Sequence, residues 1–218
     1  MVSWRSVPRQ RSRLAPAAFI DPARPVTADK PPSGANWIHE IKHDGYRLQI
    51  HKHGRTVRLF TMTGVDWTER YPWIVDGAKA LQAEAAIIDA ECCIVADNGV
   101  TVFDALHART KDSSAFAYAF DLLMVDGEDV RALPIEQRKD RLARLLPKLR
   151  RADACGIELS EHLTGDGPLA YTQACLLGLE GIVSKRLGSK YRSGRCTSWI
   201  KVKNPKAPGY LRHVDGGY

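Results

Sequence analysis

A lysine followed closely by an aspartate and a glycine is the feature of this sequence with the plainest capacity for chemistry. Lys42 stands at the end of an expected strand, and Asp44 and Gly45 follow where the chain turns into the next strand. A lysine amine attacks phosphorus only when it is neutral, but its ordinary pKa of ~10.4 keeps it protonated at neutral pH. Nearby cations or burial must therefore lower the pKa and favour the neutral amine. Asp44 can bind a metal ion, and Gly45 allows a ligand to approach the backbone. The segment predicts a nucleophilic lysine, with a surface turn as the alternative.

Four later segments supply further charged and aromatic side chains. In chain order they are Asp89-Ala90-Glu91, Tyr118-Ala119-Phe120-Asp121, Glu180-Gly181-Ile182-Val183-Ser184-Lys185 and Trp199-Ile200-Lys201-Val202-Lys203. Lys201 and Lys203 alternate with Val202, so a strand presents both amines on one face. Each segment alone has a structural explanation, such as a core position for Phe120 or a solvated edge strand for the two lysines. The ordered set is much harder to explain by coincidence.

This set resembles the motifs of the covalent nucleotidyltransferases, which include ATP-dependent DNA ligases, RNA ligases and messenger-RNA capping enzymes. The segment from Lys42 to Arg47 resembles motif I, and the four later segments resemble motifs III, IIIa, IV and V. The segments from Gly178 to Arg186 and from Lys190 to Arg195 are most similar to the ligase domain of bacterial end-joining ligases. RNA ligases and capping enzymes fit these segments less well.

The resemblance implies that Lys42 attacks the α-phosphate of ATP and becomes covalently attached to AMP. Lys201 and Lys203 are its expected catalytic partners, and together with Lys185 they are expected to neutralise phosphate charge and lower the pKa of the amine. Three carboxylates are the expected ligands of Mg²⁺, or of Mn²⁺ in its place: Asp44, Glu91 and Glu180.

The resemblance also implies contacts with the nucleotide. Arg47 is expected to contact the ribose, a role that Glu91 also suits, and Glu40 is expected to meet the edge of the adenine. Three apolar side chains complete the expected site: Ile41, Phe120 and Val183. Phe120 and Val183 are expected to pack on opposite faces of the purine.

A basic loop joins the last two segments and carries Lys190, Arg192 and Arg195. Cations on a loop between two phosphate-facing strands suit DNA phosphates, with an ordinary solvated loop as the alternative. The net charge of +7 also favours a polyanionic partner. DNA with nicks or ends is therefore the expected substrate, in repair and recombination by non-homologous end joining, and a separate subunit or end-joining protein is a further expected partner.

Two departures from the family pattern leave alternatives open. Met62 stands where motif Ia usually has an arginine. The chain ends at Tyr218, soon after motif V, and so we expect no OB-fold domain, which would need roughly 50 further residues. The alternatives to an active DNA ligase are a weakly active or non-catalytic DNA-end-binding scaffold, and an RNA ligase or capping-type enzyme.

Length and composition limit the number of domains and the cellular compartment. The 218 residues, of which 44% are hydrophobic, suffice for one large domain or two small ones. Five cysteines without zinc-like spacing indicate a reducing compartment, and no apolar run approaches the ~20 residues of a membrane span. We therefore expect a cytoplasmic protein, associated with the bacterial nucleoid and not with a membrane.

The elements that must position these residues follow from local patterns. Strands are expected at residues 37–42, 46–51, 56–61, 86–95, 100–103, 116–125, 181–185 and 198–203, and helices at 134–149 and 169–179. The proline-rich residues 21–34 are expected to run extended over the surface. The fold class is α+β, with mainly antiparallel sheets packed with helices, as in the nucleotidyltransferase (ATP-grasp-like) ligase core. The expected parts are a basic, flexible segment at 1–20, the nucleotidyltransferase domain at 21–205 and a tail at 206–218.

Overall fold

The computed structural model describes residues 18–96, 101–109, 114–146 and 156–208. The expected basic segment up to residue 17, the expected turn at 97–99, the end of the helix expected to reach 149 and the tail from 209 lie outside the described residues.

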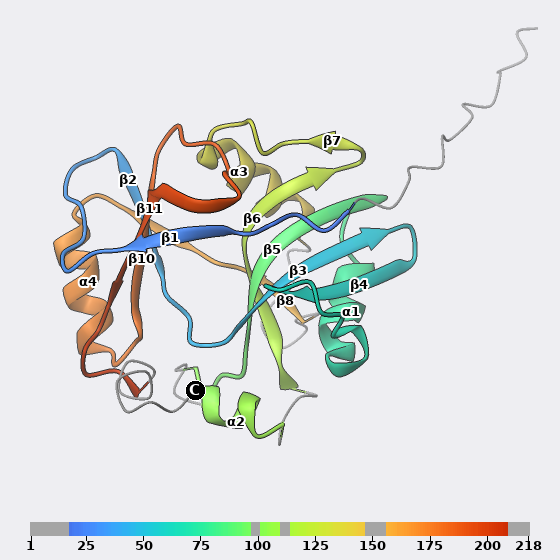
Figure 1. Cartoon of the computed structure of the whole chain (residues 1–218), viewed down its shortest axis with the longest axis horizontal. Helices are drawn as coiled ribbons and strands as arrows, with labels where there is room; N and C mark the ends of the chain where they lie inside the picture. The colour runs from blue at the N-terminus through green and yellow to red at the C-terminus, as the bar shows by residue number, and fades with distance from the viewer. Residues whose placement is uncertain (1–17, 97–100, 110–113, 147–155, 209–218) are drawn as a thin grey trace, which may run out of the picture.

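Two twisted sheets lie side by side (Figure 1). The smaller one has the strand order β1-β11-β10-β2-β9, and its strands are β1 (Ala23–Thr27), β11 (Gly194–Lys203), β10 (Gly181–Arg186), β2 (Trp37–Ile41) and β9 (His162–Thr164). Only the β1–β11 pair of this sheet is parallel. The β10–β2 pairing brings the end of β2, immediately before Lys42, beside the start of β10.

The larger sheet has the order β4-β3-β5-β6-β7, and β8 also pairs with β6. Its strands are β3 (Tyr46–His53), β4 (Thr56–Thr61), β5 (Ala85–Cys93), β6 (Phe116–Val125), β7 (Glu128–Asp129) and β8 (Ile157–Leu159). All of its pairs are antiparallel except β6–β8. The prediction of an α+β fold with mainly antiparallel sheets is therefore confirmed, and the described residues form no additional barrel domain.

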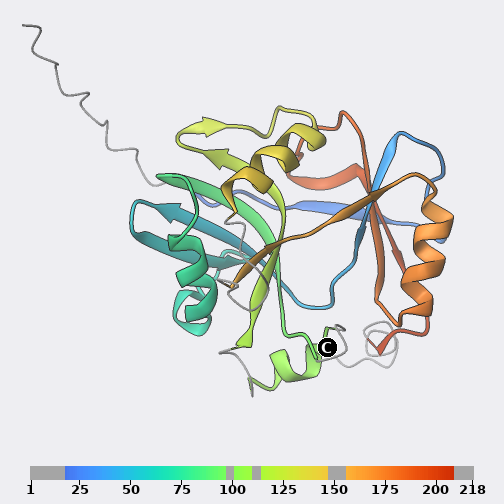
Figure 2. The same cartoon turned by 180° about the vertical axis from the view of Figure 1, so that it is seen from behind.

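Helices cover the outer faces of the two sheets. They are the short 3-10 helix η1 (Thr68–Arg70), α1 (Pro72–Lys79), α2 (Phe103–His107), α3 (Ile135–Leu145) and α4 (Gly167–Leu176). Helix α1 packs on β3 and β4, α3 packs on β6, and α4 packs on β10 and β2 (Figure 2). None of the helices in the described ranges combines the length and apolar character that crossing a lipid bilayer requires.

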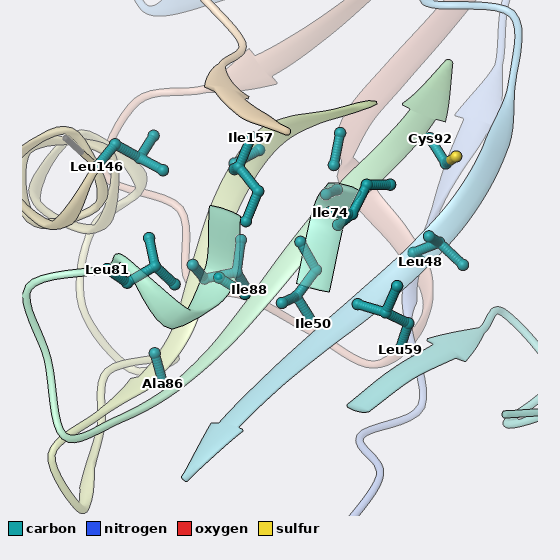
Figure 3. Close-up of a cluster of buried hydrophobic side chains, with 14 of the residues drawn as sticks. Leu48, Ile50, Leu59, Ile74, Leu81, Ala86, Ile88, Cys92, Leu146 and Ile157 are labelled. Atoms are coloured by element: carbon teal, nitrogen blue, oxygen red, sulfur yellow. The ribbon is translucent and has the colours of Figure 1, made fainter. Parts of the chain in front are cut away.

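The larger sheet has one mainly apolar face, on which α1 packs. Leu48 and Ile50 of β3 point toward Leu59, Ile88 and the helical Ile74, and all five side chains are completely buried (Figure 3). Because successive side chains of a strand point to opposite faces, burying Leu48 and Ile50 turns the odd-numbered positions of β3 to the other side of the sheet. Packing of the core therefore turns Arg47 of β3 toward the pocket described below.

A second apolar cluster joins the two sheets. Ile38 and Trp199 come from the smaller sheet, Ile87 and Leu123 come from the larger one, and all four are at most 1% exposed. Burial of side chains of this size stabilises a protein by ~1.5–3 kcal/mol each. The shared cluster makes the two sheets one packed body, which fixes the space between them.

Several local predictions need correction. The predicted strand at 100–103 is wrong over its described residues, 101–103, where Thr101 forms an isolated bridge with Val95 and Phe103 begins α2. Helix α2 is favoured because the ring of Phe103 packs 5.2 Å from that of Tyr46 while Leu106 is fully buried. Part of the segment predicted only to be extended forms β1. This strand tolerates Pro25 because it lies at the sheet edge, with a register shift directly after the proline.

Gly45 lies directly against the backbone of β5. A Cβ atom there would lie 2.1 Å from the carbonyl oxygen of Cys92 and 2.9 Å from Sγ of Cys93. The absence of a side chain at Gly45 therefore makes room for β5, whereas the sequence had indicated that it makes room for a ligand.

The substitution Gly45→Ala is expected to displace the turn that carries Lys42 and to destabilise the fold. Because a backbone carbonyl cannot move away as a side chain can, we expect a loss of about 2–3 kcal/mol, near the upper end for overpacked sites. Urea unfolding measures this loss, and an unchanged midpoint would show that the turn can relax without cost.

Candidate functional site

A pocket of about 360 Å³ lies between the two sheets, and strands of both contribute its walls. Of the nine residues predicted to contact the nucleotide, eight line it, together with Lys42: Glu40, Ile41, Arg47, Glu91, Phe120, Val183, Lys185 and Lys201. The exception is Lys203. Residues separated by up to about 160 positions in the chain are thus gathered into one cavity.

Lys42 lies at this pocket as half of an ion pair. Its Nζ donates a hydrogen bond of 2.5 Å to Oε2 of Glu180, and the side chains are 22% and 6% exposed. The pair forms because β2 and β10 are neighbouring strands, and the backbone N–H of Lys42 donates to the carbonyl oxygen of Gly181. Two segments 138 residues apart therefore meet at this amine.

Two further lysines surround the same carboxylate. The β10–β11 pairing sets Val183 opposite Lys201 and Gly181 opposite Lys203, and 3.9 Å separates Nζ of Lys203 from Oε1 of Glu180. Burial, followed by the charges of Lys42 and Lys203, lowers the pKa of Lys201. The predicted catalytic lysines are therefore brought together, although Lys203 contacts Glu180 from outside the pocket.

The three predicted metal ligands do not meet at one point. Glu91 lines the nucleotide-sized pocket, whereas Asp44 and Glu180 line a separate hollow of about 230 Å³. Within the described part of the chain, no group of three or more His, Cys, Asp or Glu residues is placed to hold a metal ion.

Glu91 has an unusual electrostatic environment. Burial raises its pKa to about 8; the charges of Lys42 and Arg47 oppose this rise, and those of Glu180 and Asp89 add to it. A carboxyl group whose pKa is raised on folding stabilises the fold fully below its ordinary pKa of 4.5, and this contribution is lost as the pH rises through about 8.

The substitution Glu91→Gln removes this titration. We expect the ligand-free variant to resist unfolding better than the parent at pH 9, by roughly 1–3 kcal/mol after allowance for partial solvent access, with little difference at pH 5. Thermal unfolding at both pH values measures the effect, and Glu69→Gln at an exposed position is the matched control. Equal stabilities of Glu91→Gln and the parent at pH 9 would contradict the raised pKa.

Two aromatic side chains, Phe120 and Trp199, line the pocket, and two cations lie against them. The guanidinium of Arg47 lies 5.3 Å, and Nζ of Lys185 4.6 Å, from the centre of the Phe120 ring. Lys185 also donates 2.7 Å to Glu40 and lies 4.2 Å from the Trp199 ring. Lys185 was predicted to neutralise phosphate charge and to lower the pKa of Lys42, and in the structure its ion-pair partner is Glu40.

Arg47 is held in place by a buried network. Its guanidinium donates to both carboxylate oxygens of Asp89, at 2.9 and 2.6 Å, and to the carbonyl oxygen of Ala23 at 2.5 Å. Asp89 also accepts a 2.6 Å hydrogen bond from the hydroxyl of Tyr191. Sequence reasoning assigned no role to Asp89 or Tyr191, which orient Arg47 and anchor the basic loop.

Lys139 is the site residue that sequence reasoning missed most completely. It lies on α3, where Ile135, Leu142 and Leu145 form the buried stripe, and its Nζ donates 2.7 Å to Oε1 of Glu40. A lysine within the apolar stripe of an amphipathic helix breaks the usual pattern. That break was the available signal in the sequence.

The basic loop presents its cations to solvent around one buried side chain. Lys190, Arg192 and Arg195 are exposed, while Tyr191 is 6% exposed. Arg195 already belongs to β11, so the cations of the predicted basic loop lie on a loop and on the start of a strand. Met62, at the position of the usual motif Ia arginine, is 46% exposed and lines the pocket.

Comparison with known proteins places this chain in a family. The family described as ATP dependent DNA ligase domain matches residues 27–203. The chain is 36% identical over 188 residues to the multifunctional non-homologous end joining protein LigD of Pseudomonas aeruginosa, covering 85% of this chain and 22% of that protein. It is also 36% identical over 171 residues to the LigD protein of Mycobacterium tuberculosis, covering 78% and 22%.

Solved structures show the same relationship. A mycobacterial DNA ligase D complexed with ATP and MES superimposes with a TM-score of 0.72 at 29% identity, covering 84% of this chain and 60% of that one. The ligase domain of M. tuberculosis LigD gives a TM-score of 0.71 at 30% identity, with the same coverage. The chain spans about a fifth of the length of the two LigD proteins named above.

Proposed function

The chain belongs to the family of ATP-dependent DNA ligase domains, and from this premise we propose that it catalyses the sealing of nicks or ends in DNA through a covalent lysyl-AMP intermediate. The observation that carries the proposal is the position of Lys42. Its amine lies at a pocket of nucleotide size, hydrogen-bonded to Glu180 and flanked by Lys201.

The proposed nucleotide site follows from the lining of the pocket. The Phe120 ring offers a stacking surface for a purine, with Val183 and Ile41 as further apolar contacts. Glu40 offers carboxylate oxygens to the amino group of adenine, and Arg47 and Glu91 are placed to meet the ribose.

In the proposed first step, Nζ of Lys42 forms a bond to the α-phosphorus of ATP, and pyrophosphate leaves. The ammonium must first lose a proton, and Oε2 of Glu180 is the acceptor within reach. Lys201 and Lys203 lie where they can neutralise phosphate charge.

In the proposed second step, Lys42 yields AMP to a DNA 5′-phosphate and regains its amine. Attack by a 3′-hydroxyl on that phosphate finally releases AMP.

The described carboxylates fit Mg²⁺, or Mn²⁺, in a limited way. Glu91 is partly buried with a raised pKa near two other carboxylates, so a cation there would offset their repulsion. Mg²⁺ usually takes one or two protein carboxylates and completes its shell with water and phosphate oxygens. Glu91 is the proposed ligand in the pocket, and Asp44 and Glu180 are the proposed ligands from the neighbouring hollow. The bound ion would supply charge stabilisation at the phosphate oxygens.

The proposed DNA contacts are the exposed cations of the basic loop, Lys190, Arg192 and Arg195. The names of the matched LigD proteins favour a role in non-homologous end joining. We propose that the protein acts on DNA in the cytoplasm, at the bacterial nucleoid, together with a separate subunit or end-joining protein.

The alternative of a DNA-end-binding scaffold is favoured by one observation, the exposed Met62 at the pocket wall where an arginine is usual. Sealing of a nick that already carries AMP separates the two functions, because it bypasses attack on ATP. An active ligase joins such a nick in the presence of Mg²⁺, and a scaffold only binds it. Failure to join either this nick or a plain nick with ATP would contradict the proposed function. The family match favours DNA ligation over RNA ligation or capping.

A further inference from the structure

Three buried charged side chains form a cluster at the wall of the pocket. Glu40 of β2 accepts hydrogen bonds of 2.7 Å from Lys139 of α3 and of 2.7 Å from Lys185 of β10, through different oxygens. Their side chains are 3%, 3% and 1% exposed. Burial of ions is costly even when they are paired, so a cluster of two cations and one anion calls for a functional explanation.

The two lysines differ in their relation to the pocket. Lys185 lines the pocket and lies against the Phe120 ring. Lys139 is not part of the pocket wall, and its second hydrogen bond, of 2.9 Å, goes to the carbonyl oxygen of Ser160. Lys139 therefore acts on a bound molecule through the two pocket residues that it contacts, Glu40 by its side chain and Ser160 by its backbone.

The two cations determine the chemical character of Glu40. Burial by itself would raise the pKa of this carboxyl group, but the charges of Lys185 and Lys139 and their hydrogen bonds hold it below its ordinary value. An ionised carboxylate only accepts hydrogen bonds, whereas a protonated carboxyl group also donates one. Glu40 therefore faces the pocket as an acceptor.

We propose that Lys139 is a positioning residue that sets the purine selectivity of the pocket by holding Glu40 as an acceptor-only carboxylate. The inference rests on the proposed function, in which Glu40 meets the edge of the base. Adenine presents an amino group at its 6-position, which an acceptor binds. Guanine presents a carbonyl oxygen there, which the carboxylate repels.

Loss of Lys139 alters this arrangement without touching the reacting atoms. Glu40 keeps a single cation, Lys185, and can take up a proton that it donates to a guanine carbonyl oxygen. Lys42, Glu180 and Lys201 keep their contacts, so the chemical step remains. We expect Lys139→Met to raise the KM for ATP about tenfold and to lower the preference for ATP over GTP by at least about tenfold, with kcat within about threefold of the parent.

The test is covalent labelling by ATP or GTP carrying a labelled α-phosphate, with KM and kcat measured for each nucleotide. Lys139→Arg keeps the charge and is expected to retain most of the selectivity. Arg141→Met is the matched control, because it removes a cation from the same helix at an exposed ion pair with Glu128. A folded Lys139→Met variant with unchanged selectivity, or with only a lower kcat, overturns the proposal.

A double-mutant cycle keeps the proposal testable if Lys139→Met folds poorly. Glu40→Gln alone should lose selectivity, and Lys139→Gln added to it should cause no further loss if Lys139 acts through Glu40. Additive losses in the double variant contradict the proposal. Absence of labelling in the parent would defeat the proposed function, whereas a labelled parent with equal selectivity in all the Lys139 variants would defeat only this inference.

Discussion

Replacement of Lys42 by alanine is expected to abolish covalent labelling of the protein by ATP, with a loss of at least about 10³-fold. The alanine has no atom that can form the bond to phosphorus. Lys201 and Lys203 cannot substitute readily, because they are fixed on β11, opposite Val183 and Gly181 of β10, and not at the position of Lys42. The measurement is incubation with Mg²⁺ and ATP labelled at the α-phosphate, followed by denaturation and gel electrophoresis, which retains only covalently bound label.

Two controls separate loss of the nucleophile from loss of the fold. Lys206→Ala removes an exposed lysine outside the pocket and should leave labelling unchanged. Sealing of a nick that already carries AMP should fall much less in Lys42→Ala than labelling does, because that reaction begins after attack on ATP. Should Lys42→Ala accept label as well as the parent does, Lys42 is not the nucleophile.

Replacement of Arg138 by methionine is expected to destabilise the fold by about 3–5 kcal/mol. Arg138 and Asp121 are completely buried, and the guanidinium donates 2.7 and 2.9 Å hydrogen bonds to the two carboxylate oxygens. It also donates to the carbonyl oxygens of Leu133 and Ser189, at 2.6 and 2.9 Å. The methionine would leave a buried carboxylate with no cation and two carbonyl groups without their donor. Urea unfolding measures the loss.

The double variant Arg138→Met/Asp121→Leu should recover part of this stability, because it leaves no unpaired buried charge. Arg141→Met, which removes an exposed arginine from the same helix, should change stability by less than about 1 kcal/mol. A single variant Arg138→Met that unfolds at the same urea concentration as the parent would mean that water or another group compensates Asp121.

The positions of the chemical residues could be predicted from the sequence because their signals are local. Alternation of buried and exposed residues defines the strands that carry Arg47 and Lys201, and chemical type limits what Lys42 or Glu180 can do. The pocket gathers Lys42, Glu40, Phe120 and the other predicted nucleotide contacts except Lys203. Local signals failed where a distant contact decided the outcome, as when Phe103 began a helix through its packing on Tyr46.

The sequence by itself determined the family and most of the long strands, and it predicted Lys42 as the nucleophile, since each depends on residue type and short spacing. Only the tertiary structure decided which charge pairs with which. Glu40 binds both Lys139, 99 residues away, and Lys185. Ionic partners depend on distances of a few ångströms between side chains and on exclusion of water. Both are set by the packing of the two sheets and α3, which no local pattern in the chain specifies.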